Sequence, residues 1–253
     1  MEVTILGSGC GIPSLERGSP GILLKIDNEP LLFDSGPGTL IRLLKNGVNY
    51  TDLRHVFYTH FHSDHTADLI PLLQAMWTTP DFERSEVLNL YGPPRFRNFL
   101  AILSQAYGDW VVEPGFPLVI KEFERGTMEF SGYKIHYLPM EHGQSAIGYR
   151  IVDESNHVVV YSGDTDYNLE IIELAKNADV LILECSFSDK NKIKGHLTPT
   201  EAAEIASRAK CRHLILTHLY PPYDDLEQEI ETEVPKIFSG KVSIGFDSMR
   251  LEL

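Results

Sequence analysis

The chain has few cysteines and no regular spacing between them. Cys10, Cys185 and Cys211 are the three cysteines among 253 residues, and they form neither a disulfide framework nor the paired pattern of a zinc knuckle. Long apolar runs are also missing, because segments such as Asp179–Glu184 are too short to cross a bilayer. The sequence therefore predicts neither a disulfide-stapled secreted domain nor a membrane protein.

The amino terminus lacks the features of a secretory signal. It reads MEVTILGSG, with no basic segment and no long apolar segment after it. We therefore expect a cytoplasmic protein whose cysteines stay reduced.

Positive charge is scarce as well. The chain has 22 Lys and Arg against 36 Asp and Glu, which gives a formal net charge of -14. A polyanion such as RNA meets a repulsive mean field around such a chain unless a local basic patch offsets it. The best basic candidates, Arg95 with Arg97 and the segment Lys190–Lys194, are short. The charge makes large RNA a less expected substrate without excluding it, since bound divalent cations cancel part of the excess.

What is present is the composition of a globular α/β protein. Hydrophobic residues make up 43% of the chain and charged residues 23%, and no linker or low-complexity stretch divides it. We predict one domain, residues 1–253. Apolar runs between turn residues predict strands at 3–6, 21–26, 30–34, 54–59, 87–91, 148–152, 157–161, 179–184 and 213–217, with three short strands before 137.

Helical periodicity occurs between these strands. It predicts helices at 39–46, 95–106, 169–175 and 199–209, and one from His65 onward with a bend at Pro71. Thr198 and Glu201 fit a capping box at the start of the helix at 199–209.

Two short patterns occur twice in the chain. A strand followed by an acidic loop is found at 31–36 (LLFDSG) and at 159–164 (VVYSGD). A strand followed by a histidine is found at 56–62 (VFYTHFH) and at 214–220 (LILTHLY). Unless the echo is due to chance, it predicts two similar halves that face each other.

The strongest chemical signal is the segment 59–65, which reads THFHSDH. His60 and His62 leave the end of a predicted strand on the same side, because side chains alternate with a period of two. Asp64 and His65 fall on the first turn of the next predicted helix and can point back over the same spot. Imidazole and carboxylate are ligands that a borderline divalent cation such as zinc prefers. A histidine-rich surface loop is the alternative.

Three further residues are weak candidates when taken singly. His142, Asp164 and His218 each have a structural alternative, such as a turn or a helix cap. Each, however, lies at a strand end or beside a turn, where an α/β sandwich gathers its site. Together with the first cluster they supply enough ligands for two metal ions.

The segment HFHSDH resembles the HxHxDH motif of the metallo-β-lactamase superfamily, and the later His, Asp and His follow in the family's order. The resemblance extends from Asp34 to His218. It implies a four-layer αββα sandwich with two divalent metal ions, zinc first, with manganese or iron as alternatives. The implied ligands are His60, His62 and His142 for one ion, and Asp64, His65 and His218 for the other, with Asp164 bridging. Asp34 is implied to steady the histidine loop from outside the ligand set.

An aspartate at the bridging position, rather than a cysteine, argues against the true β-lactamases. The segments 7–14, 31–39, 178–187 and 195–206 are similar to the ribonuclease Z branch and its phosphodiesterase relatives. This similarity implies that His196 helps to hold the scissile phosphate. The HEAT-type motif of the branch reads His196-Leu197-Thr198 here and lacks the glutamate in its second place, so a carboxylate partner for a proton relay is not implied.

The resemblance implies attack on a phosphodiester by a metal-bridging hydroxide. Asp64 would orient the hydroxide, and His196 would stabilise the phosphate or assist the leaving oxygen. Ribonuclease Z carries a long arm between the third and fourth motifs, but only twenty-one residues separate His142 from Asp164 here. We therefore predict a small or short phosphodiester as the substrate.

Other functions stay open. A ribonuclease Z-type endonuclease that processes transfer RNA 3′ ends, or a lactone, ester or thioester hydrolase, would use the same ligands. Redox di-iron chemistry also occurs on the fold, whereas a purely structural metal fits poorly, because structural zinc sites are closed and rich in cysteine. The resemblance also leaves a homodimer open.

Two features next to the motifs have no assigned role. The glycine-rich segment Gly7–Gly11 lacks the spacing of a dinucleotide-binding or P-loop motif, so we interpret it as a tight turn near the site. Tyr220 and Tyr223 follow His218 directly. They fit either a substrate pocket or the core.

Overall fold

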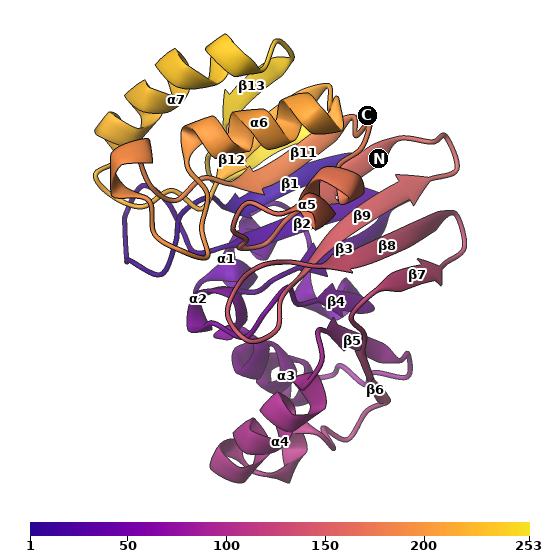
Figure 1. Cartoon of the computed structure of the whole chain (residues 1–253). Helices are drawn as coiled ribbons and strands as arrows, with labels where there is room; N and C mark the ends of the chain where they lie inside the picture. Colours follow the sequence, from indigo (N-terminus) through magenta and orange to yellow (C-terminus); the bar gives the residue numbers. More distant parts are fainter.

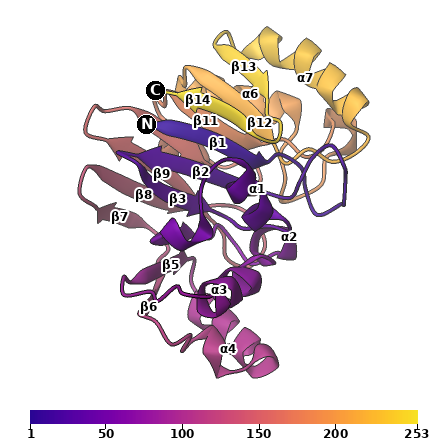
Figure 2. The same ribbon diagram turned by 180° about the vertical axis from the view of Figure 1, so that it is seen from behind.

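The structure, a computed structural model that describes residues 1–253, has two sheets packed face to face, with helices on the outer face of each (Figures 1 and 2). The αββα prediction is therefore confirmed. The first sheet has the order β14-β1-β2-β3-β4-β5-β6 and the second the order β13-β12-β11-β10-β9-β8-β7. The first comprises β1 (Glu2–Gly7), β2 (Gly21–Ile26), β3 (Glu29–Phe33), β4 (His55–Phe57), β5 (Leu88–Gly92), β6 (Leu118–Glu122) and β14 (Met249–Glu252). The second comprises β7 (Gly126–Glu129), β8 (Tyr133–Pro139), β9 (Ile147–Asp153), β10 (Val158–Tyr161), β11 (Val180–Glu184), β12 (His213–Thr217) and β13 (Lys241–Ile244).

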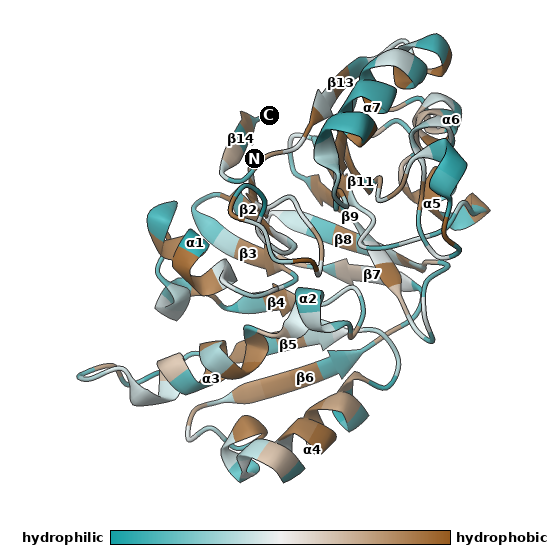
Figure 3. Cartoon of the chain, turned by 90° about the vertical axis from the view of Figure 1, so that its left-hand side faces the viewer, coloured by the Kyte–Doolittle hydropathy of each residue, from teal (hydrophilic) through white to brown (hydrophobic).

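Helices from each half of the chain cover the sheet of that half. The first sheet is flanked by α1 (Thr39–Lys45), α2 (Ser63–Thr66), α3 (Leu69–Thr78) and α4 (Phe96–Tyr107). The second is flanked by α5 (Leu169–Leu174), α6 (Pro199–Ala209) and α7 (Tyr223–Ile237), and α7 is largely hydrophilic on its outer side (Figure 3). Single turns of 3-10 helix are η1 (Tyr50–Asp52), η2 (Asp109–Val111) and η3 (Asp189–Asn191). No helix combines the length and apolarity needed to span a bilayer.

The core lies in three layers, and the strands between them are apolar on both faces. In β11, Val180 and Ile182 pack between the two sheets, whereas Leu181 and Leu183 pack against the helices. This alternation follows from the period of two along a strand. A strand that is buried on both faces is a continuous apolar run, as this one is in the sequence.

Parallel strands bring the functional loops to one edge of the sandwich. β3 pairs in parallel with β4, and β10, β11 and β12 pair in parallel with one another. The loops that follow these strands therefore begin at their carboxyl ends, where ligands gather in open α/β sheets.

The prediction of one helix from His65 onward, bent at Pro71, is wrong. The chain forms two helices there, α2 and α3, and the break between them lies at Ala67 and Asp68. The Asp68 carboxylate accepts hydrogen bonds from the backbone N–H groups of Gly38 (3.2 Å) and Leu40 (3.0 Å), which ties the break to α1. Pro71 lies in the first turn of α3, where its missing N–H would have no helical partner in any case.

The echo between the two halves is confirmed in part. β3 and β10 occupy equivalent places, because each has an antiparallel neighbour on one side and a parallel neighbour on the other. β4 lies next to β3, but β12 is separated from β10 by β11. The similar segments 56–62 and 214–220 therefore do not occupy equivalent positions in the two sheets.

Other boundaries differ less. The strand predicted at 54–59 is shorter, since β4 ends at Phe57. The capping box of Thr198 and Glu201 at α6 is confirmed. No element was predicted beyond residue 217, where the structure has α7, β13 and β14.

Candidate metal centre

The candidate site lies where the carboxyl ends of β3, β4, β10, β11 and β12 meet. The segment that carries His60 and His62 follows β4, and α2 carries Asp64 and His65. His142 lies in the loop between β8 and β9, and the loops after β10 and β12 supply Asp164 and His218. The structure thus brings together all seven residues that the sequence analysis selected as ligands.

Three histidines form the first group. Nδ1 of His62 lies 3.0 Å from Nε2 of His60 and 3.1 Å from Nε2 of His142. His60 and His142 are buried, whereas His62 is exposed at the mouth of the site. The second group joins both halves of the chain, since Nε2 of His218 lies 3.3 Å from Nε2 of His65 and 3.4 Å from Oδ2 of Asp64.

Asp164 lies between the two groups and turns one oxygen toward each. Oδ2 is 3.6 Å from Nε2 of His60 and 3.6 Å from Nε2 of His142. Oδ1 is 3.2 Å from Nε2 of His65 and 3.3 Å from Nε2 of His218. The two oxygens of one buried carboxylate therefore face two separate sets of nitrogen atoms.

These residues fit divalent metal ions. Oδ1 of Asp164 is buried and has no hydrogen-bond partner, although two imidazole nitrogens lie within 3.3 Å of it. Atoms that converge at such distances without hydrogen-bond geometry are arranged as ligands around a shared centre. Ligands about 2.0–2.1 Å from a tetrahedral ion lie roughly 3.3 Å apart, close to the distances found here.

Asp34 supports the first-sheet side of the site, as predicted. Its carboxylate is fully buried and accepts hydrogen bonds from Thr59 N (2.8 Å), Thr59 Oγ1 (2.8 Å), His65 Nδ1 (2.8 Å) and Tyr161 Oη (2.8 Å). Nδ1 of His60 in turn donates to Thr59 Oγ1 (3.0 Å). Because the Nδ1 atoms are engaged, the Nε2 atoms of His60 and His65 remain to face the centre.

Glu184 supports the second-sheet side, and the sequence analysis missed it. It is the last residue of β11 and accepts a hydrogen bond from His196 Nδ1 (3.0 Å). It also accepts one from Ser186 Oγ (2.7 Å), to which His218 Nδ1 donates (2.9 Å). The HEAT-type motif carries its carboxylate directly beside the histidine in the chain, whereas here the fold supplies a carboxylate from twelve residues away. The available signal was a glutamate at the end of a buried apolar strand, where a charged residue needs partners.

Of the two residues assigned catalytic roles, Asp64 belongs to the cluster and His196 borders it. Their side chains are 13% exposed, so each reaches the surface of the site. His196 lies with Asp164 and His218 in a third group of potential ligand atoms within 4.8 Å of one another. His142 is held by a bond from its Nδ1 to the carbonyl oxygen of Gly195 (2.7 Å), next to His196.

The environment sets the charge of these groups. Burial by itself raises the pKa of Asp164, but the surrounding His218, His65 and His60 lower it well below its usual range. Burial, together with the neighbouring His65, lowers the pKa of His60 well below its usual value. An ionised carboxylate at Asp164 and a neutral ring at His60 are the forms that bind metal ions. Burial lowers the pKa of His65, but the charges of Asp164 and Asp34 raise it well above its usual value, so metal binding at that ring displaces a proton.

The segment between His142 and Asp164 has no room for an arm. It contains β9 and β10, joined by a tight turn in which His157 N donates to Asp153 Oδ1 (2.8 Å). The glycine-rich segment lies beside the site, as expected, but it is the end of β1 and the start of the long loop to β2 rather than a tight turn. A Cβ atom on Gly11 would lie 3.4 Å from the Asp64 carboxylate.

The chain is similar in sequence to known proteins. Ribonuclease Z of Pyrococcus furiosus is 30% identical over 306 positions, covering 97% of this chain and 96% of that protein. Ribonuclease Z of Myxococcus xanthus is 28% identical over 307 positions, covering 100% of this chain and 98% of that protein. Since this chain has 253 residues, the alignments contain many positions of the relatives that have no counterpart here.

Solved structures agree on the fold. The metallo-beta-lactamase fold protein YhfI of Bacillus subtilis superposes with a TM-score of 0.84 at 28% identity, covering 100% of this chain and 99% of that one. The short form of human tRNase Z has a TM-score of 0.80 at 24% identity, covering 100% and 99%. At that identity the likeness concerns the fold alone.

The match to a family model agrees with both the sequence motif and the geometry. Residues 30–219 match the model of the beta-lactamase superfamily domain, and this range contains Asp34 and all seven clustered residues. The chain is a metal-dependent hydrolase of the metallo-β-lactamase superfamily, and it belongs to the ribonuclease Z-like branch of that superfamily.

Proposed function

We propose that this protein hydrolyses phosphodiester bonds at two divalent metal ions, as a ribonuclease Z-type endonuclease. The observation that carries the two-ion site is the division of the Asp164 oxygens between two sets of nitrogen atoms. The curated relatives bear the name ribonuclease Z. That name favours the ribonuclease alternative over the small phosphodiester that the sequence analysis placed first.

The ligand assignment follows the two groups. His60, His62 and His142 hold one ion, Asp64, His65 and His218 hold the other, and Asp164 bridges them. We propose zinc, which suits imidazole and carboxylate ligands and is present in a PqqB structure of the same fold from Methylobacterium extorquens. Manganese and iron accept the same ligand atoms.

The protein's own groups complete the chemistry. When bound, such ions lower the pKa of a water molecule and neutralise charge on the phosphoryl oxygens. Asp64, at the surface of the cluster, orients the attacking oxygen. His196 donates its Nδ1 proton to Glu184, which leaves Nε2 to hold the phosphate or to give a proton to the leaving oxygen. The charge of Glu184 favours the protonated ring. Burial alone lowers the pKa of His196, but the hydrogen bond to Glu184 and its charge raise that pKa above the usual value.

A small phosphodiester is the second candidate, and specific observations favour it. In the basic segment 190–194, Lys192 is held by Asp166 (2.7 Å), the carbonyl oxygen of His196 and Glu201, which leaves Lys190 and Lys194 as its exposed basic residues. With a net charge of -14 and no arm between β9 and β10, the chain has few means of holding a long polyanion.

The test is a substrate panel with the metal-loaded protein. Precursor transfer RNA with a 3′ trailer, bis(p-nitrophenyl) phosphate, a lactone and a thioester are compared, and metal content is measured for His62→Ala and for the matched control His157→Ala. Cleavage of the RNA at the trailer supports the ribonuclease. Diester turnover without RNA cleavage supports the second candidate, and turnover of the lactone or thioester alone overturns both.

A further inference from the structure

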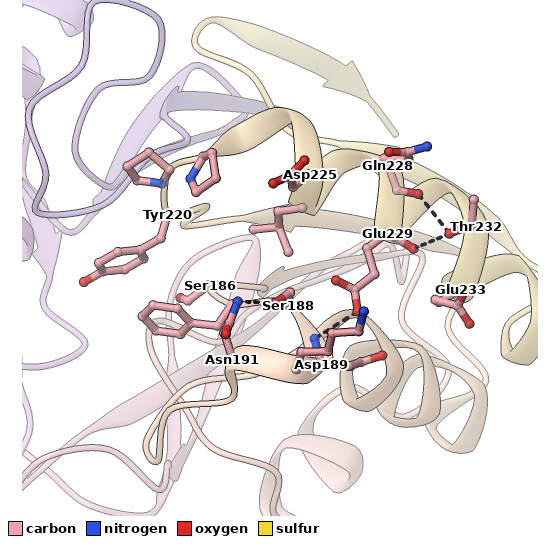
Figure 4. A pocket seen from close by; sticks show the side chains of 15 residues that line it. Ser186, Ser188, Asp189, Asn191, Tyr220, Asp225, Gln228, Glu229, Thr232 and Glu233 are labelled. Carbon is pink, nitrogen blue, oxygen red and sulfur yellow. Dashed lines mark hydrogen bonds between the residues drawn. The ribbon is translucent and has the colours of Figure 1, made fainter.

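A cavity of about 660 Å³ lies beside the candidate metal centre, between the loop that follows β11 and helix α7 (Figure 4). Its walls come from residues 186–191, residues 220–222 and the inner side of α7. The volume falls within the range of roughly 300–1,000 Å³ typical of pockets that bind small molecules. The cavity was not predictable without α7, which supplies one of its walls.

One end of the cavity is formed by residues that contact the histidines of the site. Oγ of Ser186 lies 2.9 Å from His218 Nδ1 and 3.3 Å from His196 Nδ1. The Tyr220 ring is centred 5.7 Å from the ring of His218 and 4.6 Å from the ring of Phe187. Figure 4 shows Tyr220 and Ser186 on one side of the cavity, with Glu229 and Glu233 on the other. The cavity therefore begins directly beside the rings of His196 and His218.

The remaining walls carry excess negative charge. Asp189, Asp225, Glu229 and Glu233 line the cavity, and Lys190 is the one basic residue among its fifteen lining residues. Burial and the nearby charge of Asp189 raise the pKa of Glu229, although the bond from Asp189 N opposes the shift. Such a field repels a phosphate and accepts a neutral or cationic group.

We propose that this cavity receives the substrate group on one side of the scissile phosphate. This group is of nucleoside size, has a ring that stacks on Tyr220, and carries no phosphate of its own. The proposal rests on the proposed phosphodiesterase function and narrows its substrate. A precursor transfer RNA could place only a one-nucleotide trailer there, so this inference favours the second candidate, the small phosphodiester, over the ribonuclease Z-type endonuclease. The aromatic residues and the volume admit a base and a sugar, and the four carboxylates exclude a further phosphate.

The test uses the metal-loaded protein and three dinucleotides. These are uridylyl-uridine with its single internal phosphate, the same compound with an added 5′-phosphate, and the same compound with an added 3′-phosphate. We expect a terminal phosphate at one of the two ends to lower kcat/KM by about tenfold. The double variant Asp225→Asn/Glu229→Gln is expected to raise the kcat/KM for that compound relative to uridylyl-uridine by a similar factor.

A matched control lies on the same helix. Asp224 and Glu231 are exposed and do not line the cavity, so Asp224→Asn/Glu231→Gln changes the charge of α7 equally and is expected to leave the ratio unchanged. Equal rates for all three dinucleotides, or equal effects of the two double variants, would overturn the cavity assignment while phosphodiester hydrolysis stands. Failure to cleave any diester, including bis(p-nitrophenyl) phosphate, would overturn the proposed function and this inference together.

Discussion

Nδ1 of His196 lies 3.0 Å from Oε1 of Glu184, a carboxylate that is 1% exposed at the end of β11. The same carboxylate accepts a hydrogen bond from Ser186, which holds His218. On the opposite sheet, Asp34 holds His65 in a similar way. Each sheet therefore supplies one buried carboxylate that fixes the rings of the site without itself facing the metal centre.

The pairing of Glu184 with His196 predicts strong coupling between their substitutions. We expect Glu184→Gln and His196→Gln each to lower kcat for diester hydrolysis by about 10²-fold, at the low end for a group that transfers a proton in the transition state. The double variant should lose little more than either single variant, because both remove the same unit. Steady-state kinetics at saturating metal provide the measurement. Glu204→Gln, at an exposed position of α6, is the control, and additive losses would contradict the pairing.

Asp34 is expected to act on metal affinity. Its two oxygens accept four hydrogen bonds. In an asparagine, an NH₂ group replaces one of these oxygens and would face donors instead of accepting from them. We expect Asp34→Asn to weaken metal binding by about 10–100-fold, as is usual when the partner of a ligating histidine is lost. Competition with a chelator of known affinity measures the change. Wild-type affinity in the variant would show that the loop is fixed by other contacts.

His213 predicts a pH dependence of stability. Burial, with the charge of Lys241 beside it, lowers the pKa of His213 to about 4. In the unfolded chain the pKa of a histidine is about 6.5. The unfolded chain thus binds the proton more readily. The stability from this residue is full above about pH 6.5 and is lost as the pH falls toward 4.

The measurement is urea denaturation of the wild type and of His213→Gln between pH 7 and pH 4. The glutamine can still bond to Ser243, the partner of His213 Nε2 at 2.9 Å. We expect the midpoint of the wild type to fall more steeply with acid than that of the variant. Parallel curves would mean that the imidazole is not kept neutral by the fold.

The aromatic stack between the sheets predicts a large core effect. Phe57 is fully buried, with its ring centroid 4.7 Å from that of Phe33 and 4.4 Å from that of Tyr91. We expect Phe57→Ala to lower the free energy of unfolding by about 3–5 kcal/mol, the cost of deleting a buried phenylalanine. Phe246→Ala, at a side chain that is 57% exposed, should change it by less than about 0.5 kcal/mol. Chemical denaturation of both variants makes the comparison.

The metal motif and most of the strands were predictable from the sequence alone. The THFHSDH segment is local, because three imidazoles and a carboxylate lie within six consecutive residues, from His60 to His65. The strands at 21–26 and 213–217 were predicted with their observed bounds, because a buried strand is a plain apolar run. Such signals depend on neighbours in the chain, which propensity and periodicity describe.

The tertiary structure alone decided the contacts between distant segments. The meeting of Glu184 with His196, the turning of each Asp164 oxygen to a different group, and the cavity under α7 depend on how strands from both sheets end at one edge. Helix α7 itself escaped prediction, since its polar residues outnumber the three that it buries, Leu226, Ile230 and Val234. Those side chains gain their partners only once α6 and β13 are in place. Packing against distant residues, rather than local preference, therefore determines where this helix lies and what shape it gives to the site.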